Sequence, residues 1–329
     1  MANLETTYMG LKLKNPLIAA SSGLTNSLNK ILELEAEGIG AVVLKSLFEE
    51  QIQNEASHLL SMDSSEMHYP EAGDYIKNYV RDNTVQNYLQ LIRDVKKSCS
   101  IPVIASINCL SADEWIGFAK EIEAAGADAL ELNAFIVPTS RHTTSEELEL
   151  EYLKILSAVK KEVSIPIAMK IGMNFTNLIG FVDKLYAHGA SAVVMFNRFY
   201  EPDIDINSLK MVGSEIFSSA SDLTRTLRWT GIISSAVKNI EIAASTGIHD
   251  GEAVIKELLA GAKVTEICST LYLNGPAVVG EIQSILKRFM KKWNFHSVDE
   301  FRGRLSYKSI PDSAMYERAQ FMKYFSKHE

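Results

Sequence analysis

The pattern that most constrains this chain is a helix end, a glycine and a short apolar strand, and it occurs four times. Glycine after a helix accepts the left-handed conformation that lets the chain turn away. The strand that follows is almost wholly apolar, as expected for a strand buried on both faces of a parallel sheet. The four copies lie at 37–45, 121–133, 188–195 and 260–267.

A second repeat places Ile-Pro at the start of two further strands. The stretch 96–105 is echoed by 160–168, and a proline at the first position of a strand removes no ladder donor. The segments 102–133 and 166–197 are therefore successive strand–helix–strand units. Repeated units of this kind are typical of a parallel barrel.

We therefore predict an α/β fold of the (β/α)8 TIM-barrel type, organised as one domain over residues 1–329. A hairpin within residues 6–15 should close the bottom of the barrel. Long insertions follow the second strand, over 46–82, and the sixth, over 198–221, and residues 293–329 should form a helical C-terminal extension. The predicted strands are 16–20, 41–45, 102–107, 128–133, 166–171, 191–197, 240–245 and 264–269, with boundary errors of about two to four residues.

Composition and charge exclude several classes of protein. The chain has 329 residues, of which 47% are apolar, and a net charge of −8, which argues against nucleic acid as a partner. No apolar run approaches the length of a membrane span, and the N-terminus has no signal peptide. Three scattered cysteines fit a reducing compartment and give no zinc-site spacing. We expect a cytoplasmic protein without a bound metal.

The residues that follow the predicted strands are polar, although the strands themselves are apolar. In a barrel of this type the C-terminal ends of the strands face the active site. The residues at these ends are Ser21, Ser22, Gly23, Lys45, Ser46, Asn108, Asn133, Lys170, Asn197, Thr246, Gly247, Ser269 and Thr270.

Lys170 lies among apolar residues, where its charge costs desolvation free energy unless an anion compensates it. One interpretation is a buried ion pair with a barrel carboxylate such as Glu131. The other is function, either as a neutral amine that forms a Schiff base or as a charge that stabilises an anionic cofactor or intermediate. The end of a barrel strand favours function. Lys45 offers the same choice.

Small polar residues follow the last two predicted strands, at 245–248 and 268–270. Barrels bind phosphate in these two loops, and Gly247 would let the backbone approach an anion closely. Small residues can also serve only to make tight turns. The three asparagines at the barrel mouth suit a planar heterocycle with alternating carbonyl and N–H groups, or they cap loop backbone.

Together these residues carry a family resemblance. Over about residues 4–290 the chain resembles the dihydroorotate dehydrogenase family, and its middle stretch is also similar to the flavin domain of dihydropyrimidine dehydrogenase. The stretches that carry the resemblance are 15–16, 20–23, 45–46, 101–108, 125–133, Lys170 and 246–248.

The resemblance implies an FMN-binding barrel that oxidises dihydroorotate, or a related pyrimidine-like cyclic amide, by hydride transfer to flavin. It implies catalytic roles for Lys45, Asn133, Lys170 and Asn197, and the soluble members it points to commonly form homodimers. The residues expected around the flavin ring are Ala20, Ser21, Ser22, Gly23, Lys45, Ser46, Asn108, Asn133, Lys170 and Asn197. Those expected at its phosphate are Thr246, Gly247, Ile248, Ser269 and Thr270.

The loop after the fourth strand departs from the family pattern. The family has a Cys or Ser before a proline there as catalytic base, whereas this chain has Val137 before Pro138, and a valine cannot take a proton. His142 on the same loop has the most suitable intrinsic pKa for a replacement base, so we place it in the catalytic set. Thr246 stands where the family usually has glycine, and Arg198 is an unexpected cation at the mouth.

Three function classes remain open on the sequence. The favoured one is an FMN oxidoreductase. The second is a flavin-free lyase or isomerase that uses Lys170 as a Schiff-base nucleophile, and the third is a flavin-binding barrel that has lost catalysis.

Overall fold

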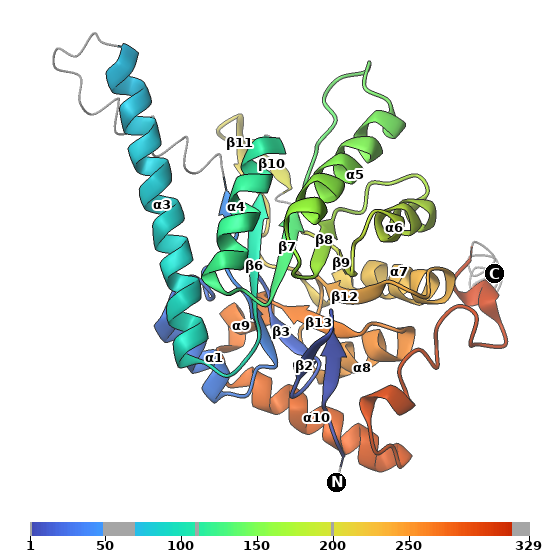
Figure 1. Cartoon of the computed structure of the whole chain (residues 1–329). Helices are drawn as coiled ribbons and strands as arrows, with labels where there is room; N and C mark the ends of the chain where they lie inside the picture. The colour runs from blue at the N-terminus through green and yellow to red at the C-terminus, as the bar shows by residue number, and fades with distance from the viewer. Residues whose placement is uncertain (1, 49–69, 109–111, 199–200, 318–329) are drawn as a thin grey trace.

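The structure is a computed structural model that describes residues 2–48, 70–108, 112–198 and 201–317. Within these residues, eight parallel strands form a closed barrel (Figure 1). Closure comes from pairing β13 with β3 and β4 with β6, so the predicted barrel is confirmed. The strands are β3 Leu17–Ala19, β4 Ala41–Val43, β6 Val103–Asn108, β7 Ala129–Asn133, β8 Ile167–Ile171, β9 Ala192–Met195, β12 Glu241–Ser245 and β13 Val264–Ile267.

Helices connect the strands and cover the outside of the barrel (Figure 1). The glycines of the four repeats all adopt positive φ, between 90° and 118°, as the repeat predicted. Asp250 begins α8 as its N-cap by accepting a hydrogen bond from the Ala253 backbone N–H at 2.8 Å. The helices are α1 Leu28–Ala36, α3 Pro70–Ser98, α4 Ala112–Ala125, α5 Ser145–Glu162, α6 Leu178–Ala187, α7 Leu223–Ala236, α8 Gly251–Ala260, α9 Ser269–Asn274 and α10 Val278–Trp293.

The N-terminal hairpin closes the bottom of the barrel, as predicted. Its strands β1 Thr6–Tyr8 and β2 Leu11–Leu13 are antiparallel. Tyr8 and Leu13 are buried in one apolar cluster with Ile18, Ile104 and Val264 from the barrel strands. This packing leaves the opposite, C-terminal end of the barrel for a site.

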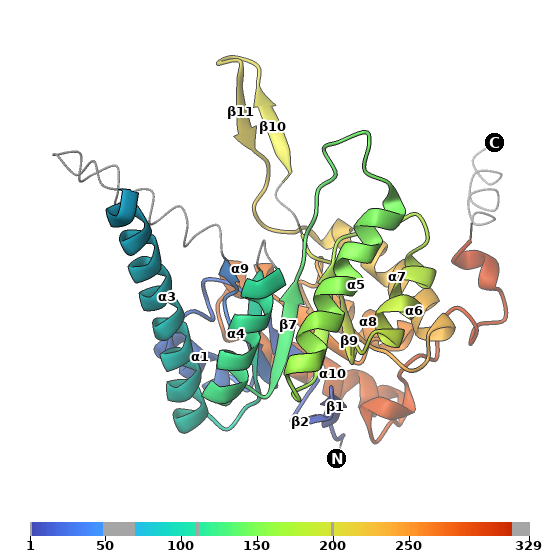
Figure 2. The same ribbon diagram turned by 45° about the horizontal axis from the view of Figure 1, so that its top comes forward.

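The insertion after β9 forms a second hairpin, β10 Pro202–Asp205 and β11 Lys210–Gly213. It projects away from the barrel at the end opposite the N-terminus (Figure 2). The short strand β5 Leu47–Phe48 pairs with β6 at the start of the first insertion. Most of that insertion, 49–69, lies outside the described residues.

Over residues 294–317 the C-terminal extension differs from the predicted helical tail, and the last part of that prediction, 318–329, lies outside the described residues. Asn294 takes a left-handed conformation, with φ 57°, and ends α10. Up to residue 317 the chain then forms turns, with two 3-10 helices at Val298–Glu300 and Ser313–Met315. Among the described residues, none of the helices combines the length and the apolar composition that a membrane crossing requires.

Candidate active site at the barrel mouth

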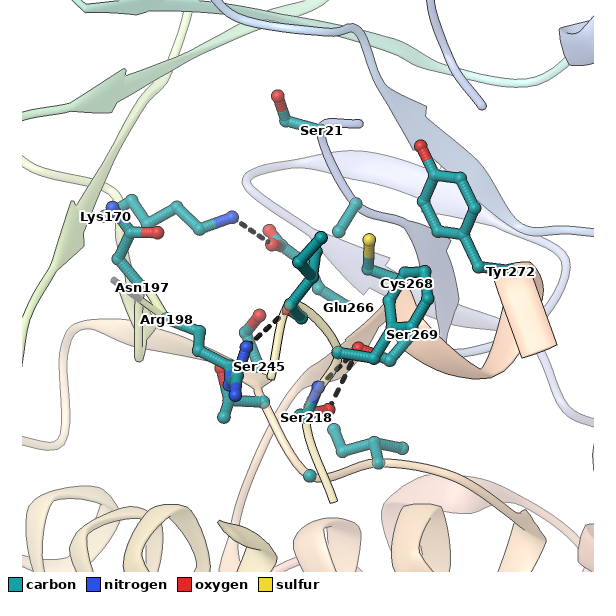
Figure 3. A pocket seen from close by; sticks show the side chains of 16 residues that line it. Ser21, Lys170, Asn197, Arg198, Ser218, Ser245, Glu266, Cys268, Ser269 and Tyr272 are labelled. Carbon is teal, nitrogen blue, oxygen red and sulfur yellow. Dashed lines mark hydrogen bonds and ion pairs between the residues drawn. The ribbon is translucent and has the colours of Figure 1, made fainter. Parts of the chain in front are cut away.

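A cavity of about 380 Å³ lies at the C-terminal ends of the barrel strands. Half of its lining was predicted from the sequence, and Figure 3 shows how these side chains converge on it. The predicted residues in the lining are Ala20, Ser21, Lys170, Asn197, Thr246, Gly247, Ile248 and Ser269. Arg198 at the mouth and Ser245 and Cys268 in the two small polar loops were noted in the sequence without a role in binding flavin. The lining residues that were not noted in the sequence are Ile216, Phe217, Ser218, Glu266 and Tyr272.

Two further predicted residues contact this lining without joining it. The Asn197 side-chain N–H donates to Asn133 Oδ1 at 2.8 Å. The Ser46 backbone N–H donates to Ser21 Oγ at 2.8 Å, and the two hydroxyls lie 3.0 Å apart. These contacts bring Asn133 and Ser46 to the cavity wall from behind.

The remaining predicted residues lie outside the cavity lining. Asn108 and Lys45 are half-buried at strand ends, and the Thr270 hydroxyl is buried and donates to the His249 carbonyl. His142 is exposed, and the Arg141 Nε–H donates to its Nε2 at 3.2 Å. Ser22 and Gly23 flank the wall, and the Ser22 hydroxyl accepts the Leu24 N–H.

Lys170 forms a buried cluster with two carboxylates. Its Nζ lies 2.9 Å from Glu266 Oε2 and 3.3 Å from Glu131 Oε1. Lys170 is 6% exposed, and the glutamates are 1–2% exposed, so little solvent screens the charges. Lys170 therefore has both the ion pair with Glu131 and the position at the cavity that the two interpretations of the sequence predicted. Its contact with Glu266 was not predicted.

The cluster sets the charge states of its members. Burial lowers the pKa of Lys170, but the charges of Glu131 and Glu266 outweigh it and raise that pKa above the ordinary value. Burial, reinforced by the charge of Glu266, raises the pKa of Glu131 to about 8. Lys170 is therefore an ammonium at neutral pH, and Glu131 keeps its proton to a higher pH than an ordinary glutamate does.

A chain of hydroxyl groups leads from the cavity to this cluster. Ser46 Oγ lies 2.7 Å from Ser106 Oγ, which approaches Glu131 Oε1 at 3.5 Å. Tyr88 fixes Ser106, because its hydroxyl accepts the Ser106 N–H at 2.8 Å and donates to the Ser106 carbonyl. The chain starts at Ser21 in the cavity lining.

Small hydroxyl residues meet at the other end of the cavity. Ser218 donates to Ser269 Oγ from its backbone N–H and from its hydroxyl, both at 3.0 Å, and His249 Nε2 lies 3.0 Å from Ser218 Oγ. Gly247 forms the wall beside them with φ 81°. A Cβ there would overlap the Leu223 backbone at the start of α7, so packing alone requires glycine.

Thr246 adopts φ 81°, which is rare for a β-branched residue. Its hydroxyl turns away from the turn and donates to the Phe196 carbonyl at 2.9 Å. The methyl and hydroxyl groups that replace the expected glycine are thereby held against the end of β9.

Residues from the second insertion form one rim of the cavity. The Arg198 guanidinium donates to the carbonyls of Glu215 and Ile216, which holds this segment over the mouth. The Phe217 and Tyr272 rings lie 5.3 Å apart. A Cβ on Gly23 would lie 2.7 Å from the Tyr272 hydroxyl, so glycine permits this close approach.

A sequence signal was available for Glu266 but not for Ser218. Glu266 interrupts an apolar strand with a charge, as Lys170 does, and the two charges are complementary. Ser218 lies in an insertion without a strand pattern, so nothing local marks it.

Comparison with known proteins agrees with this architecture. A protein-family model described as dihydroorotate dehydrogenase matches residues 3–290. Similar proteins include the catalytic subunits of dihydroorotate dehydrogenase B (NAD(+)) from Thermoplasma acidophilum, 26% identical, and from Thermoplasma volcanium and Pyrococcus abyssi, each 27% identical. These matches cover 91–92% of this chain and 98–99% of each relative. The chain therefore belongs to the dihydroorotate dehydrogenase family.

Proposed function

We propose that the protein is an FMN-dependent oxidoreductase that oxidises dihydroorotate, or a related cyclic amide, by hydride transfer to flavin. The observation that carries this proposal is one cavity with hydroxyl groups at one end and Lys170 and Asn197 at the other. It supports a flavin because the chain belongs to a family of dihydroorotate dehydrogenases.

The residues present fit FMN. Ser218 and Ser269 offer hydroxyl donors suited to a phosphate, and Gly247 keeps side-chain atoms out of the turn beside them. Lys170 has three N–H donors and uses two on carboxylates, which leaves one for a ring carbonyl. The cavity volume of about 380 Å³ lies within the range of roughly 300–1,000 Å³ of ligand pockets.

When bound, the flavin supplies the hydride acceptor. Lys170 places a positive charge at the cavity wall, where it stabilises negative charge that develops on a ring. The Asn197–Asn133 contact leaves the Asn197 carbonyl oxygen as an acceptor and the Asn133 amide as a donor. This pair can orient a cyclic amide, which carries the complementary groups.

The Schiff-base alternative is disfavoured by the state of Lys170. A Schiff base requires a neutral amine, whereas the two carboxylates raise the pKa of Lys170 and keep it protonated. Borohydride treatment in the presence of small carbonyl compounds should leave Lys170 unmodified, as judged by peptide mass spectrometry.

The decisive experiment is spectroscopic. The purified protein should be yellow or should take up added FMN, and denaturation should release FMN and not FAD, as judged by chromatography. Anaerobic mixing with dihydroorotate should then bleach the flavin. A protein that binds no flavin contradicts the proposal, and one that binds FMN but is never reduced by cyclic amides supports the catalytically impaired alternative.

We further propose that two copies of the chain associate through the β10–β11 hairpin. Leu209 and Ile206 are 85% and 79% exposed at its tip, and Met211 is 66% exposed beside them. Exposed apolar groups in such a cluster mark association surfaces. The cytoplasmic location and the single-domain organisation stay predictions.

A further inference from the structure

The most complete polar arrangement outside the direct cavity lining is the hydroxyl chain behind Ser21. Its successive oxygens lie 3.0 Å apart between Ser21 and Ser46 and 2.7 Å apart between Ser46 and Ser106. Ser106 and Ser46 are buried, at 0% and 4% exposure. A hydroxyl donates one proton and accepts others, so a chain of three can pass a proton along without moving a heavy atom.

The inner end of the chain is an ionisable group. Ser106 Oγ approaches Glu131 Oε1 at 3.5 Å, and the same oxygen lies 3.3 Å from Lys170 Nζ. The carboxyl group is fully enclosed, and among the described residues its polar links to the cavity wall are this chain, the Lys170 contact and a hydrogen bond with Glu266. Lys170 and Glu266 belong to the cavity lining themselves.

The two phenols that face Glu131 do not compete for this proton. Tyr8 from β1 and Tyr88 from α3 are buried phenols whose pKa values are raised by burial and by neighbouring carboxylates, so both stay neutral. Glu266 from β13 and Lys170 from β8 are paired with each other at 2.9 Å. Glu241 from β12 is directed to the Met9 backbone N–H. Glu266 also hydrogen-bonds the Glu131 carboxyl group, so the proton is held between these two carboxyl groups, and Glu131 is the one that the hydroxyl chain reaches.

We propose that Glu131 stores a proton that it exchanges with the cavity through Ser106, Ser46 and Ser21. This inference rests on the proposed function, since the ring that gains electrons in the cavity is taken to be a flavin. With a flavin bound, Ser21 would give one proton to the reduced ring and receive one from Ser46. Ser46 receives one from Ser106, and Ser106 receives one from the Glu131 carboxyl group.

The charge balance of this transfer is closed within the cluster. Glu131 becomes a carboxylate beside the Lys170 ammonium. It regains its proton from solvent after the ring in the cavity has passed on its electron pair. The electron pair would come from the cyclic amide as a hydride, and the second hydrogen that the amide loses would leave as a proton to solvent, which balances the proton that Glu131 later takes back. A carboxyl that titrates close to neutral pH is well matched to such a task. Ser46 is thereby a positioning and relay residue behind Ser21, not a cofactor contact.

The equilibrium test follows the midpoint potential of bound FMN against pH, with a redox dye and an enzymatic reductant, so it needs no substrate turnover. Glu131 and the flavin influence each other's charge, and such linkage is reciprocal. In the wild type the slope of potential against pH should change near pH 8, and Glu131→Gln should remove that change. A straight plot in the wild type, or an unaltered change in Glu131→Gln, overturns the proton store.

The kinetic test distinguishes the serine path from the proton store at Glu131. Ser46→Ala should keep the equilibrium change of slope, because a path does not alter equilibria. It should slow flavin reduction by dihydroorotate by about 10²-fold, the lower end of what proton transfer by a positioned group contributes, and should alter its solvent isotope effect. Ser284→Ala, the same substitution on the outer face of α10, is the matched control. Unchanged rate and isotope effect in Ser46→Ala would remove the serine path.

A measurement on the wild type covers the case in which Glu131→Gln does not fold. In protein labelled with 13C-glutamate, the infrared difference between reduced and oxidised states should show loss of a protonated carboxyl band, slower in Ser46→Ala. Absence of that band contradicts the proposal. Failure to bind FMN at all refutes the proposed function itself, so the two failures are distinguishable.

Discussion

At the residue scale, Gly247 combines a positive φ with a tight backbone contact. A Cβ there meets the Leu223 backbone, whereas at Gly126, with φ 99°, it meets open space. Gly126→Ala should therefore lose only the left-handed preference, about 1–2 kcal/mol. Gly247→Ala adds overpacking and should lose about 1–3 kcal/mol more. Urea unfolding of the two variants measures the difference, and equal losses would contradict it.

Lys170 is expected to matter for stability as well as for chemistry. Lys170→Met leaves two buried carboxyl groups without their cation, which should cost about 3–5 kcal/mol. Adding Glu266→Gln should recover part of the loss, because only Glu131 then remains, and it is already protonated at pH 7. Lys184→Met, which breaks the exposed 2.9 Å pair with Glu149, should cost far less, because solvent screens that pair. Thermal unfolding compares them, and a double variant less stable than Lys170→Met would be evidence against this account.

A catalytic role for His142 can be tested separately from the proposed serine path. Its ring is exposed and outside the cavity lining, and Val137, where the family base would stand, is 53% exposed. If the loop does not move, His142→Ala should change the rate of flavin reduction by dihydroorotate less than about twofold, since a lost general base costs about 10²–10⁴-fold. A loss of that size in stopped-flow measurements would instead restore the predicted base role.

Residues of the candidate site that directly follow a strand could be predicted from the sequence. Contacts between residues that are far apart in the sequence could not. Lys170 was marked by its apolar surroundings, and its ion pair with Glu131 was one of the alternatives. Its contact with Glu266 joins residues 96 positions apart, so only barrel closure brings them together. Likewise, Ser46 was expected beside a flavin, but its hydroxyl faces Ser21 and Ser106.

At the scale of elements, the barrel strands were predictable because glycine stops and strand-initial prolines mark their starts. The hairpin β10–β11 carries no such mark. Its turn, 206–209, lacks the Asn-Gly or Asp-Gly pair that signals a tight hairpin, and Leu209 takes the left-handed φ of 51° instead. The tail escaped prediction because Asn294 ends α10 and no apolar periodicity then imposes a helix.

The same hairpin supplies a test of association. Leu209→Asp and Met211→Asp place charges on an exposed apolar surface, so they should convert a dimer into a monomer in analytical ultracentrifugation. The melting temperature at low protein concentration should stay the same, because neither side chain packs in the barrel core. Lys210→Asp, between them, is the positional control. A wild type that sediments as a monomer contradicts the proposed homodimer.

At the scale of the whole molecule, two buried glutamates should make stability depend on pH. Burial raises the pKa of Glu257 in α8 from its ordinary value of 4.5 to about 8, and Glu131 reaches the same value. Between about pH 4.5 and pH 8 the folded state therefore binds more protons than the unfolded state. Stability should fall as pH rises through this window, by about 1.4 kcal/mol per pH unit for each proton.

Glu257→Gln isolates one of the two glutamate contributions to the pH dependence of stability. Thr230 is the side chain that approaches the Glu257 carboxyl group, and the carboxyl oxygens have no further hydrogen-bond partner among the described residues, so a neutral amide of the same shape loses little at low pH. The variant should show about half the wild-type slope of unfolding free energy against pH. Glu252→Gln, an exposed change five residues earlier in α8, should leave the slope as it is. A wild-type stability that rises from pH 5 to pH 8 would contradict the prediction.

The closure of the barrel has a consequence for how the chain is made. Thr265 pairs with Leu17, and the Asn3 backbone N–H bonds to the His296 carbonyl. The first barrel strand therefore cannot complete its pairing until residues late in the sequence have been synthesised. At roughly 5–20 residues per second of synthesis, β3 and the N-terminal hairpin remain without these partners for on the order of ten seconds or more. During that interval the apolar surfaces of β3 and β4 are open to other nascent chains. The chain is therefore expected to depend on chaperones most while it is being synthesised.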